Sequence, residues 1–312
     1  MKGIELSERY FLQYGKPMLE EQFADLLPLV SVGLFGKGSE CFGFDDETSH
    51  DHDFEPGFCV MLPDENVVDR KRAFALERAY AKLHKEFEGY VRAPLSPVGG
   101  NRHGVFRTSE WLEEAIGNPT GELSLREWLG IEEFRLAEVV NGKMFHDGGN
   151  FGKIRASLAR YPRDVRLKKL AGRLLAAAQA GQYNFARCLA HGEKAAAQLA
   201  VFEFCKHAVA AAFLLNDVYA PYYKWVFRAL KNLPKLSKIA APLEFLLTTD
   251  NERDNAEKKI GAIELVCADL VDELKKQELT KATCGDLGKH AYSVNDGVAD
   301  ANLRNLHVLF AI

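Results

Sequence analysis

The chain has 312 residues, of which 47% are hydrophobic and 27% are charged, and its formal net charge is −4 at pH 7. This length and composition are typical of a globular protein with a well-buried core, and they exclude a disordered, collagen-like or coiled-coil chain. Because the net charge is slightly negative, the protein as a whole has no field that favours long nucleic acid or an anionic membrane surface.

The cysteines and the N-terminal residues predict a cytoplasmic protein. The six cysteines lie far apart, without the paired spacing of a structural zinc site, which favours free buried thiols in a reducing compartment. The first residues, MKGIELSERYFLQYGK, contain no apolar signal-peptide run, and the chain has no stretch of about 18 apolar residues. We therefore expect no membrane association, and nothing in the sequence indicates an oligomeric state.

The pattern of residues 1–161 changes repeatedly, which predicts an α+β domain. Helix-like stretches alternate there with short apolar runs that are bounded by Gly, Pro and Asp. Asp64 is the expected N-cap of the longest of these helices. The expected elements are helices near 4–14 and 18–27, a strand near 29–36, a polar loop at 37–50, a strand around 51–62, a helix near 64–88 and a short strand at 103–108.

Residues 162–312 are predicted to form an all-α helical bundle domain, because long Ala-rich and Leu-rich segments follow Pro162. Two runs, RDVRLKKLAGRLL and KAAAQLAVFEFCKHAVAAAFLLN, are apolar around much of their circumference, as in helices that pack on two sides. The expected helices lie near 163–180, 193–218, 222–232, 242–249 and 253–277.

One segment, GKGSECFGFDDETSHDHDF, carries residues suited to phosphate and metal binding. Gly36, Gly38 and Ser39 predict a small-residue turn whose main-chain N–H groups approach an anion closely. Asp51 and Asp53 follow and lead into a predicted strand, where alternate residues share a face. Two carboxylates on one face suit Mg²⁺, which also binds phosphate oxygens. The alternative is a solvated acidic loop, because such short patterns are common.

The strings GSECFGFDDETSHDHDFEPGFCVML and GKMFHDGGNFGKIRASLARYPRDVRLKKLA resemble a bacterial family known only as a domain of unknown function. That family is similar to the DNA polymerase beta-type nucleotidyltransferases, near the antibiotic-modifying nucleotidyltransferases. The resemblance covers most of the chain and implies a nucleotidyltransferase-like mixed sheet with flanking helices before the bundle. The shared Gly-Ser and Asp-x-Asp motif implies that Gly38 and Ser39 contact phosphate and that Asp51 and Asp53 bind the metal.

The same resemblance implies a role for Lys224, because the stretch LLNDVYAPYYKW is similar to a segment that places a lysine near the nucleotide phosphates. The alternative is that the Lys224 side chain lies along its aromatic neighbours, among them Trp225. We expect the lysine to bind the phosphates.

The sequence departs from the family pattern at the third carboxylate. Active members carry it on the strand after the intervening helix, and here HGVFRT offers His103 and Arg107 but no acid. Glu110 and Asp147 are candidates, although Asp147 is equally explained as the N-cap of the following helix. Loss of this acid would weaken activation of the attacking hydroxyl while leaving nucleotide binding possible.

Two further features have competing interpretations. Glu203 lies on an otherwise apolar helix and is our candidate for a catalytic base; alternatively, Lys206 and His207 are its partners within the helix. A basic run predicts either a solvated helix face or an anionic acceptor site. Its residues are Arg163, Arg166, Lys168, Lys169 and Arg173.

The sequence therefore predicts a Mg²⁺-dependent nucleotidyltransferase that moves a nucleoside monophosphate, AMP from ATP, to a hydroxyl group of an unidentified small molecule or protein. The alternative is a catalytically weakened regulatory or scaffold protein that binds nucleotide on the same fold. A protein-modifying enzyme or an antitoxin-like component is a third interpretation. No motif identifies the acceptor, because a fold does not define its substrate.

Overall fold

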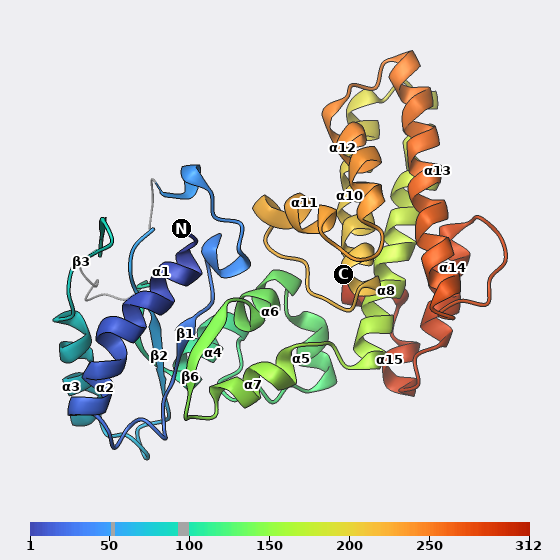
Figure 1. Ribbon diagram of the computed structural model, residues 1–312. Coiled ribbons are helices and arrows are strands. Elements are labelled where there is room, and N and C mark those ends of the chain that lie inside the picture. Colours follow the sequence, from blue (N-terminus) through green and yellow to red (C-terminus); the bar gives the residue numbers. More distant parts are fainter. Residues whose placement is uncertain (51–53, 93–99) are drawn as a thin grey trace. The chain divides into compact units, whose positions relative to one another are not determined.

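The computed structural model describes residues 1–50, 54–92 and 100–312 (Figure 1). The chain divides into two compact units, one made of Met1–Leu123 with Ile131–Ala159 and the other of Ser124–Gly130 with Arg160–Ile312. The first unit contains a mixed sheet with helices and the second is helical, so the predicted fold class is confirmed.

The first unit is built on a four-stranded sheet in the order β5-β2-β1-β6. β1 pairs antiparallel with both β2 and β6, and β2 pairs parallel with β5. All residues of β1 and β2 are buried, which explains why neither strand shows an alternation of apolar and charged residues in the sequence. The strands are β1 (Ser31–Leu34), β2 (Cys59–Leu62), β5 (Gly104–Arg107) and β6 (Lys143–Asp147).

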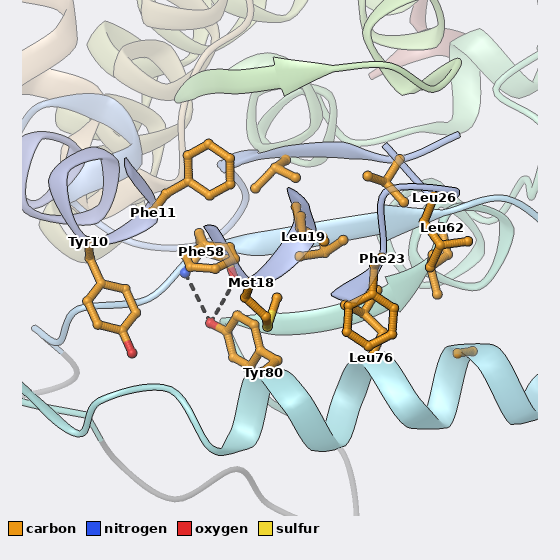
Figure 2. Packing of buried hydrophobic residues seen from close by; sticks show 14 of the residues in the cluster. Tyr10, Phe11, Met18, Leu19, Phe23, Leu26, Phe58, Leu62, Leu76 and Tyr80 are labelled. Carbon is orange, nitrogen blue, oxygen red and sulfur yellow. Dashed lines mark hydrogen bonds between the residues drawn. The ribbon is translucent and has the colours of Figure 1, made fainter. Parts of the chain in front are cut away.

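One face of this sheet is covered by the N-terminal helices and by α3 (Arg70–Ala81). Figure 2 shows Tyr10, Phe11 and Leu19 of the N-terminal helices in one buried cluster with Leu76 and Tyr80 of α3. The hydroxyl of Tyr80 donates to the carbonyl of Phe58 at 2.8 Å and accepts from the Phe58 amide at 3.1 Å. The N-terminal helical stretch consists of α1 (Gly3–Tyr10), the π-helix η1 (Phe11–Gly15) and α2 (Lys16–Gln22).

The helix predicted at 64–88 is shorter than expected. α3 begins after Asp69, whose side chain accepts a hydrogen bond from the amide of Arg72 at 2.7 Å, so Asp69 and not Asp64 is the N-cap. The residues beyond α3 form a small hairpin instead of continuing the helix. Its strands are β3 (Glu86–Phe87) and β4 (Tyr90–Val91).

The sequence pattern does not predict β6, the fourth strand of the sheet. β6 is an edge strand, and its residues KMFHD are exposed or half-buried, so it has no buried face that alternation could reveal. Two helices of the first unit, α4 (Thr108–Ile116) and α6 (Glu133–Val140), also escaped prediction. The helix α7 (Phe151–Leu158) is the one that the capping alternative for Asp147 expected.

Every residue of the second unit is described, and none lies in a strand. The five helices expected from the sequence are present, and α10 packs against both α8 and α13 (Figure 1). The helical elements are α5 (Leu125–Gly130), α8 (Arg163–Ala177), η4 (Ala178–Phe185), α9 (Ala186–Ala190), α10 (Lys194–Leu215), α11 (Tyr223–Lys231), η5 (Ser237–Ile239), α12 (Ala240–Thr248), α13 (Arg253–Lys276), α14 (Leu287–Asp296), α15 (Ala301–Asn305) and η6 (Val308–Ala311).

α10 is a long apolar helix of this unit. Among the described residues it alone has the length and composition that could span a membrane, but 72% of its most apolar window is buried inside the protein. It is therefore packed as a core helix. All six cysteines are free, and Cys41, Cys59, Cys205 and Cys267 are buried, in agreement with the free thiols expected from their spacing.

Candidate functional site

The predicted glycine turn lies directly after β1. Gly36 and Gly38 have positive φ values of 100° and 124°, a conformation that favours glycine over residues with a side chain. The amide of Asn141, at the end of α6, holds the start of the turn: its Oδ1 accepts from the Gly36 N–H at 2.9 Å and its Nδ2 donates to the Gly36 carbonyl at 2.8 Å. The turn is therefore fixed to the adjacent helix by paired hydrogen bonds.

The donors that follow in the turn are unoccupied. Within the described parts of the chain, the main-chain N–H groups of Lys37, Gly38 and Ser39 have no hydrogen-bond partner. The carbonyl of Ser39 accepts from the amides of Phe42 and Phe44 at 3.1 and 2.8 Å, which closes the chain behind the turn. Successive free N–H groups in a fixed loop are a common way of binding an anion, as the sequence predicts for Gly38 and Ser39.

An ion pair lies against the turn. The guanidinium of Arg102 pairs with the carboxylate of Glu40 and donates to the carbonyl of Lys37 at 3.0 Å. The Glu40 side chain is 9% exposed and the Arg102 side chain is 25% exposed, and burial lowers the pKa of Arg102. A Cβ atom at Gly38 would overlap the Arg102 guanidinium, so a side chain there would displace Arg102 in addition to straining the main chain.

The two predicted metal ligands, Asp51 and Asp53, lie outside the described residues, as does His52. The 3₁₀-helix η3 (Glu47–His50) precedes them, and the described residues 54–58 that follow are not in a strand, so the strand expected from 51 to 62 is confirmed only over Cys59–Leu62. In the described part of the chain, no three His, Cys, Asp or Glu side chains are grouped to hold a metal ion. Mg²⁺ binding by Asp51 and Asp53 stays a prediction.

The strand β5 carries no acid, as its sequence indicates. His103, just before β5, is buried, and its Nδ1 lies 3.3 Å from Oε1 of Glu55. Asp147 lies at the far end of β1, opposite Ser31, whose hydroxyl donates to its Oδ1 at 2.6 Å. Because a strand rises about 3.3 Å per residue, Asp147 is roughly 10 Å along β1 from the end that leads into the turn.

Asp147 does contribute to the start of α7, although it is not the N-cap residue. Its Oδ1 also accepts from the main-chain N–H of Gly152 at 3.3 Å, whereas the N-cap position is occupied by Asn150. Through these bonds Asp147 stabilises the start of α7, which is close to the capping role that the alternative interpretation gives it. Glu110, the other candidate, lies in the first turn of α4 and lines the cavity described next.

A cavity of about 510 Å³ opens beside the turn, within the first unit. Gly36, Lys37 and Arg102 are part of its wall, and Trp111 lines it while packing edge-on against Phe35. Its volume lies in the range of small-molecule sites. The charged side chains of its lining are balanced in sign: Lys37, Arg102, Arg107 and Arg135 against Glu77, Glu110, Glu114 and Glu138.

Glu138, on α6, is the acid of this cavity with the most altered environment. Burial raises the pKa of its carboxyl group, and the charges of Lys37 and Arg135 oppose that shift. A carboxyl group in such a setting takes up a proton more readily than one in water. Sequence reasoning missed Glu138 because it stands on an ordinary amphipathic helix between the buried residues Ala137 and Val139.

Glu203 has the partners that its alternative interpretation expects. Its side chain is 47% exposed and lies 3.7 Å from Lys206 Nζ and 3.2 Å from His207 Nε2. The apolar surroundings expected for a base are therefore missing, because nearly half of the side chain faces water. We do not include Glu203 in the proposed function.

Lys224 lies in the second unit, on α11. Its side chain is exposed, and its Nζ lies 6.0 Å from the ring centroid of Trp225, which agrees with the alternative of packing along an aromatic neighbour. Contact of Lys224 with nucleotide phosphates stays a prediction.

The basic run on α8 is not a solvated face, which corrects the first interpretation. Lys168 and Lys169 are buried, at 0% and 3% exposure. Lys168 Nζ donates to Asn295 Oδ1 at 2.8 Å and to the Leu306 carbonyl at 2.6 Å, and Lys169 Nζ donates to the Leu129 carbonyl at 2.9 Å. Apolar neighbours on both sides of α8 bury these lysines, and main-chain carbonyls take the place of water.

Comparison with known proteins identifies a family for part of the chain. Residues 128–226 match the family described as Domain of unknown function (DUF4037), which confirms the predicted kind of family over that segment. No curated protein and no solved structure matches the chain.

Proposed function

We propose that this protein is a nucleotidyltransferase that binds a nucleoside triphosphate at the turn of residues 36–39 and transfers its nucleoside monophosphate to a hydroxyl group. The observation that carries the proposal is the row of free N–H groups at Lys37, Gly38 and Ser39, at the end of a buried strand and beside a cavity of about 510 Å³. Such donors bind phosphate oxygens without reorganisation.

Cationic side chains near the turn suit the polyphosphate part of ATP, the nucleotide we propose. Lys37 belongs to the turn, and Arg107 and Arg135 line the cavity that opens beside it. Mg²⁺ would be held by Asp51 and Asp53, which stand close before β2 in the chain. When bound, the ion would neutralise charge on the phosphates.

In this proposal Glu138 takes the proton from the acceptor hydroxyl at its carboxylate. The cavity that it lines adjoins the turn, so a hydroxyl bound in the cavity would lie between the carboxylate and the phosphates. Its raised pKa brings it nearer to the operating pH, which favours a general base. The family name describes no function, and the acceptor class, cytoplasmic localisation and any role of Lys224 remain parts of the proposal.

The metal ligands are tested by calorimetry of Mg²⁺ and ATP with Asp51→Ala and Asp53→Ala. We expect the affinity to fall at least tenfold, the scale of a lost charge-assisted contact, with an unchanged Tm. Glu47→Ala removes an exposed acid from the same loop and serves as control. Equal affinity in all four proteins would contradict the assignment.

A second function, nucleotide binding without transfer, is favoured by one observation, the lack of an acid on β5. A regulatory or scaffold protein needs the turn but not the third carboxylate. Pyrophosphate release separates the two functions. If the wild type binds Mg²⁺ and ATP tightly but releases no pyrophosphate with cell extract or with hydroxylated compounds, the scaffold function is the better one.

A further inference from the structure

The surroundings of Gly38 contain a carboxylate where the proposed function places phosphate. A Cβ atom added to Gly38 would lie 2.6 and 2.7 Å from Oε1 and Oε2 of Glu40, and it would overlap the Arg102 guanidinium. Both oxygens of an anion and the cation that pairs with it therefore meet over the glycine. The free N–H groups of Lys37, Gly38 and Ser39 belong to the same turn.

We propose that Arg102 is the side chain that binds the phosphate groups at this turn, and that the Glu40 carboxylate occupies their place until they arrive. The inference rests on the proposed function and adds to it a phosphate-binding residue with a built-in competitor. Neither residue belongs to the Gly-Ser and Asp-x-Asp motif.

Burial couples the arrival of phosphate at Arg102 to the release of the Glu40 carboxylate. Glu40 is 9% exposed and Arg102 is 25% exposed at the side chain, so each charge needs a partner in this setting. A guanidinium binds carboxylate and phosphate through the same planar donors. An incoming phosphate can therefore replace the carboxylate without leaving Arg102 unpaired, and the released Glu40 must then turn away from the anion.

The position of Arg102 supports access from solution. Arg102 lines the cavity of about 510 Å³ as well as the turn, so a ligand in the cavity reaches the guanidinium directly. Its Nη2 donates to the carbonyl of Lys37 at 3.0 Å, which orients the side chain at the turn independently of Glu40.

The test measures binding of sodium tripolyphosphate and of Mg²⁺ with ATP by calorimetry. Glu40→Gln keeps the shape of the side chain and removes the competing charge, so we expect tripolyphosphate to bind about tenfold more tightly. Arg102→Gln should weaken binding at least tenfold, on the scale of a charge-assisted contact. In the double variant the gain from Glu40→Gln should disappear, because the competition acts through Arg102.

Matched controls separate this effect from general charge. Glu114→Gln removes an acid of the same cavity that is 77% exposed and lies 3.5 Å from Lys37 Nζ, and it should change the affinity less than threefold. If Glu40→Gln does not fold, as judged by circular dichroism, Glu40→Asp withdraws the carboxylate by one methylene, and we expect it to raise the affinity about threefold.

The outcomes distinguish the inference from the proposed function. Tripolyphosphate binding that is equal in the wild type, Glu40→Gln and Arg102→Gln overturns the inference and leaves the turn as a phosphate site. If the variants change tripolyphosphate binding as expected but ATP binds no more tightly than tripolyphosphate, the result supports the inference and contradicts nucleotide binding. No binding to the wild type or to Glu40→Gln overturns both.

Discussion

The turn after β1 and the basic face of α8 were both candidates for binding anions, and the structure treats them in opposite ways. At the turn, the N–H groups of Lys37, Gly38 and Ser39 are held in place and have no partner among the described residues. On α8, Lys168 donates to Asn295 Oδ1 and to the Leu306 carbonyl. The charged groups of Lys168 and Lys169 are used inside the fold, whereas the turn retains free main-chain donors.

Our proposal of an anion site at the turn therefore rests on the availability of main-chain donors and not on formal charge. A buried lysine whose donors already bond carbonyls gains little from a ligand, since binding would leave those carbonyls unpaired. A fixed loop with free N–H groups has already lost its conformational entropy, and these N–H groups give up no internal hydrogen bond on binding.

The largest expected effect is on α8. Lys168→Met should lower the free energy of unfolding by about 3 to 5 kcal/mol, because it leaves several buried acceptors without a donor. Urea unfolding measures this loss. Arg163→Ala, which removes a side chain that is 63% exposed on the same helix, should cost less than about 1 kcal/mol. A loss of the same size in both variants would show that Lys168 is not a structural cation.

The next effect is at the turn. Gly38→Ala should weaken tripolyphosphate binding about hundredfold, because the new Cβ overlaps Arg102 and also meets an unfavourable φ of 124°. Gly43→Ala is the control, since its φ of 70° is strained as well but the added Cβ meets no atom within 4 Å. Calorimetry that finds the same affinity for both variants would show that the turn is only structural.

A smaller effect concerns the pH dependence of stability through His207, which lies on α10. Burial and the charges of Arg173 and Lys206 lower the pKa of His207 from 6.5 to about 3, and Arg173 Nη1 lies 3.3 Å from its Nδ1, which acts as an acceptor only while the ring is neutral. Between these two pKa values the unfolded chain binds the additional proton, so stability is complete above pH 6.5 and is lost as the pH falls.

The size of this loss follows from the protonation of the unfolded chain. From pH 6.5 down to about 5, we expect the free energy of unfolding to fall by about 1.5 to 2 kcal/mol through His207. Urea unfolding of the wild type and of His207→Gln at both pH values measures this loss. The free energy of unfolding of the variant should fall less between the two pH values than that of the wild type. An equal fall in both proteins would mean that His207 is already charged in the folded protein.

The sequence predicted the parts of this protein that depend on local pattern. The apolar runs around β1 and β2 and the helix α10 were predicted because burial on both faces leaves a run that needs no tertiary information to recognise. The helix α13 was also predicted, but its buried residues alternate with exposed ones along the helix. The positive φ values of Gly36 and Gly38 likewise follow from a local conformation that glycine adopts readily. The edge strand β6 was missed because it has no buried face.

Tertiary structure alone decided which side chains meet at the turn. Arg102 stands 62 residues beyond Glu40, and Asn141 stands 105 residues beyond Gly36, so no local pattern could pair them. Tertiary packing also assigned residues 124–130 to the second unit and buried Lys168, although the sequence of α8 suggests a wet basic face. Burial and partners are set by what packs against a residue, and that information is distributed over distant parts of the chain.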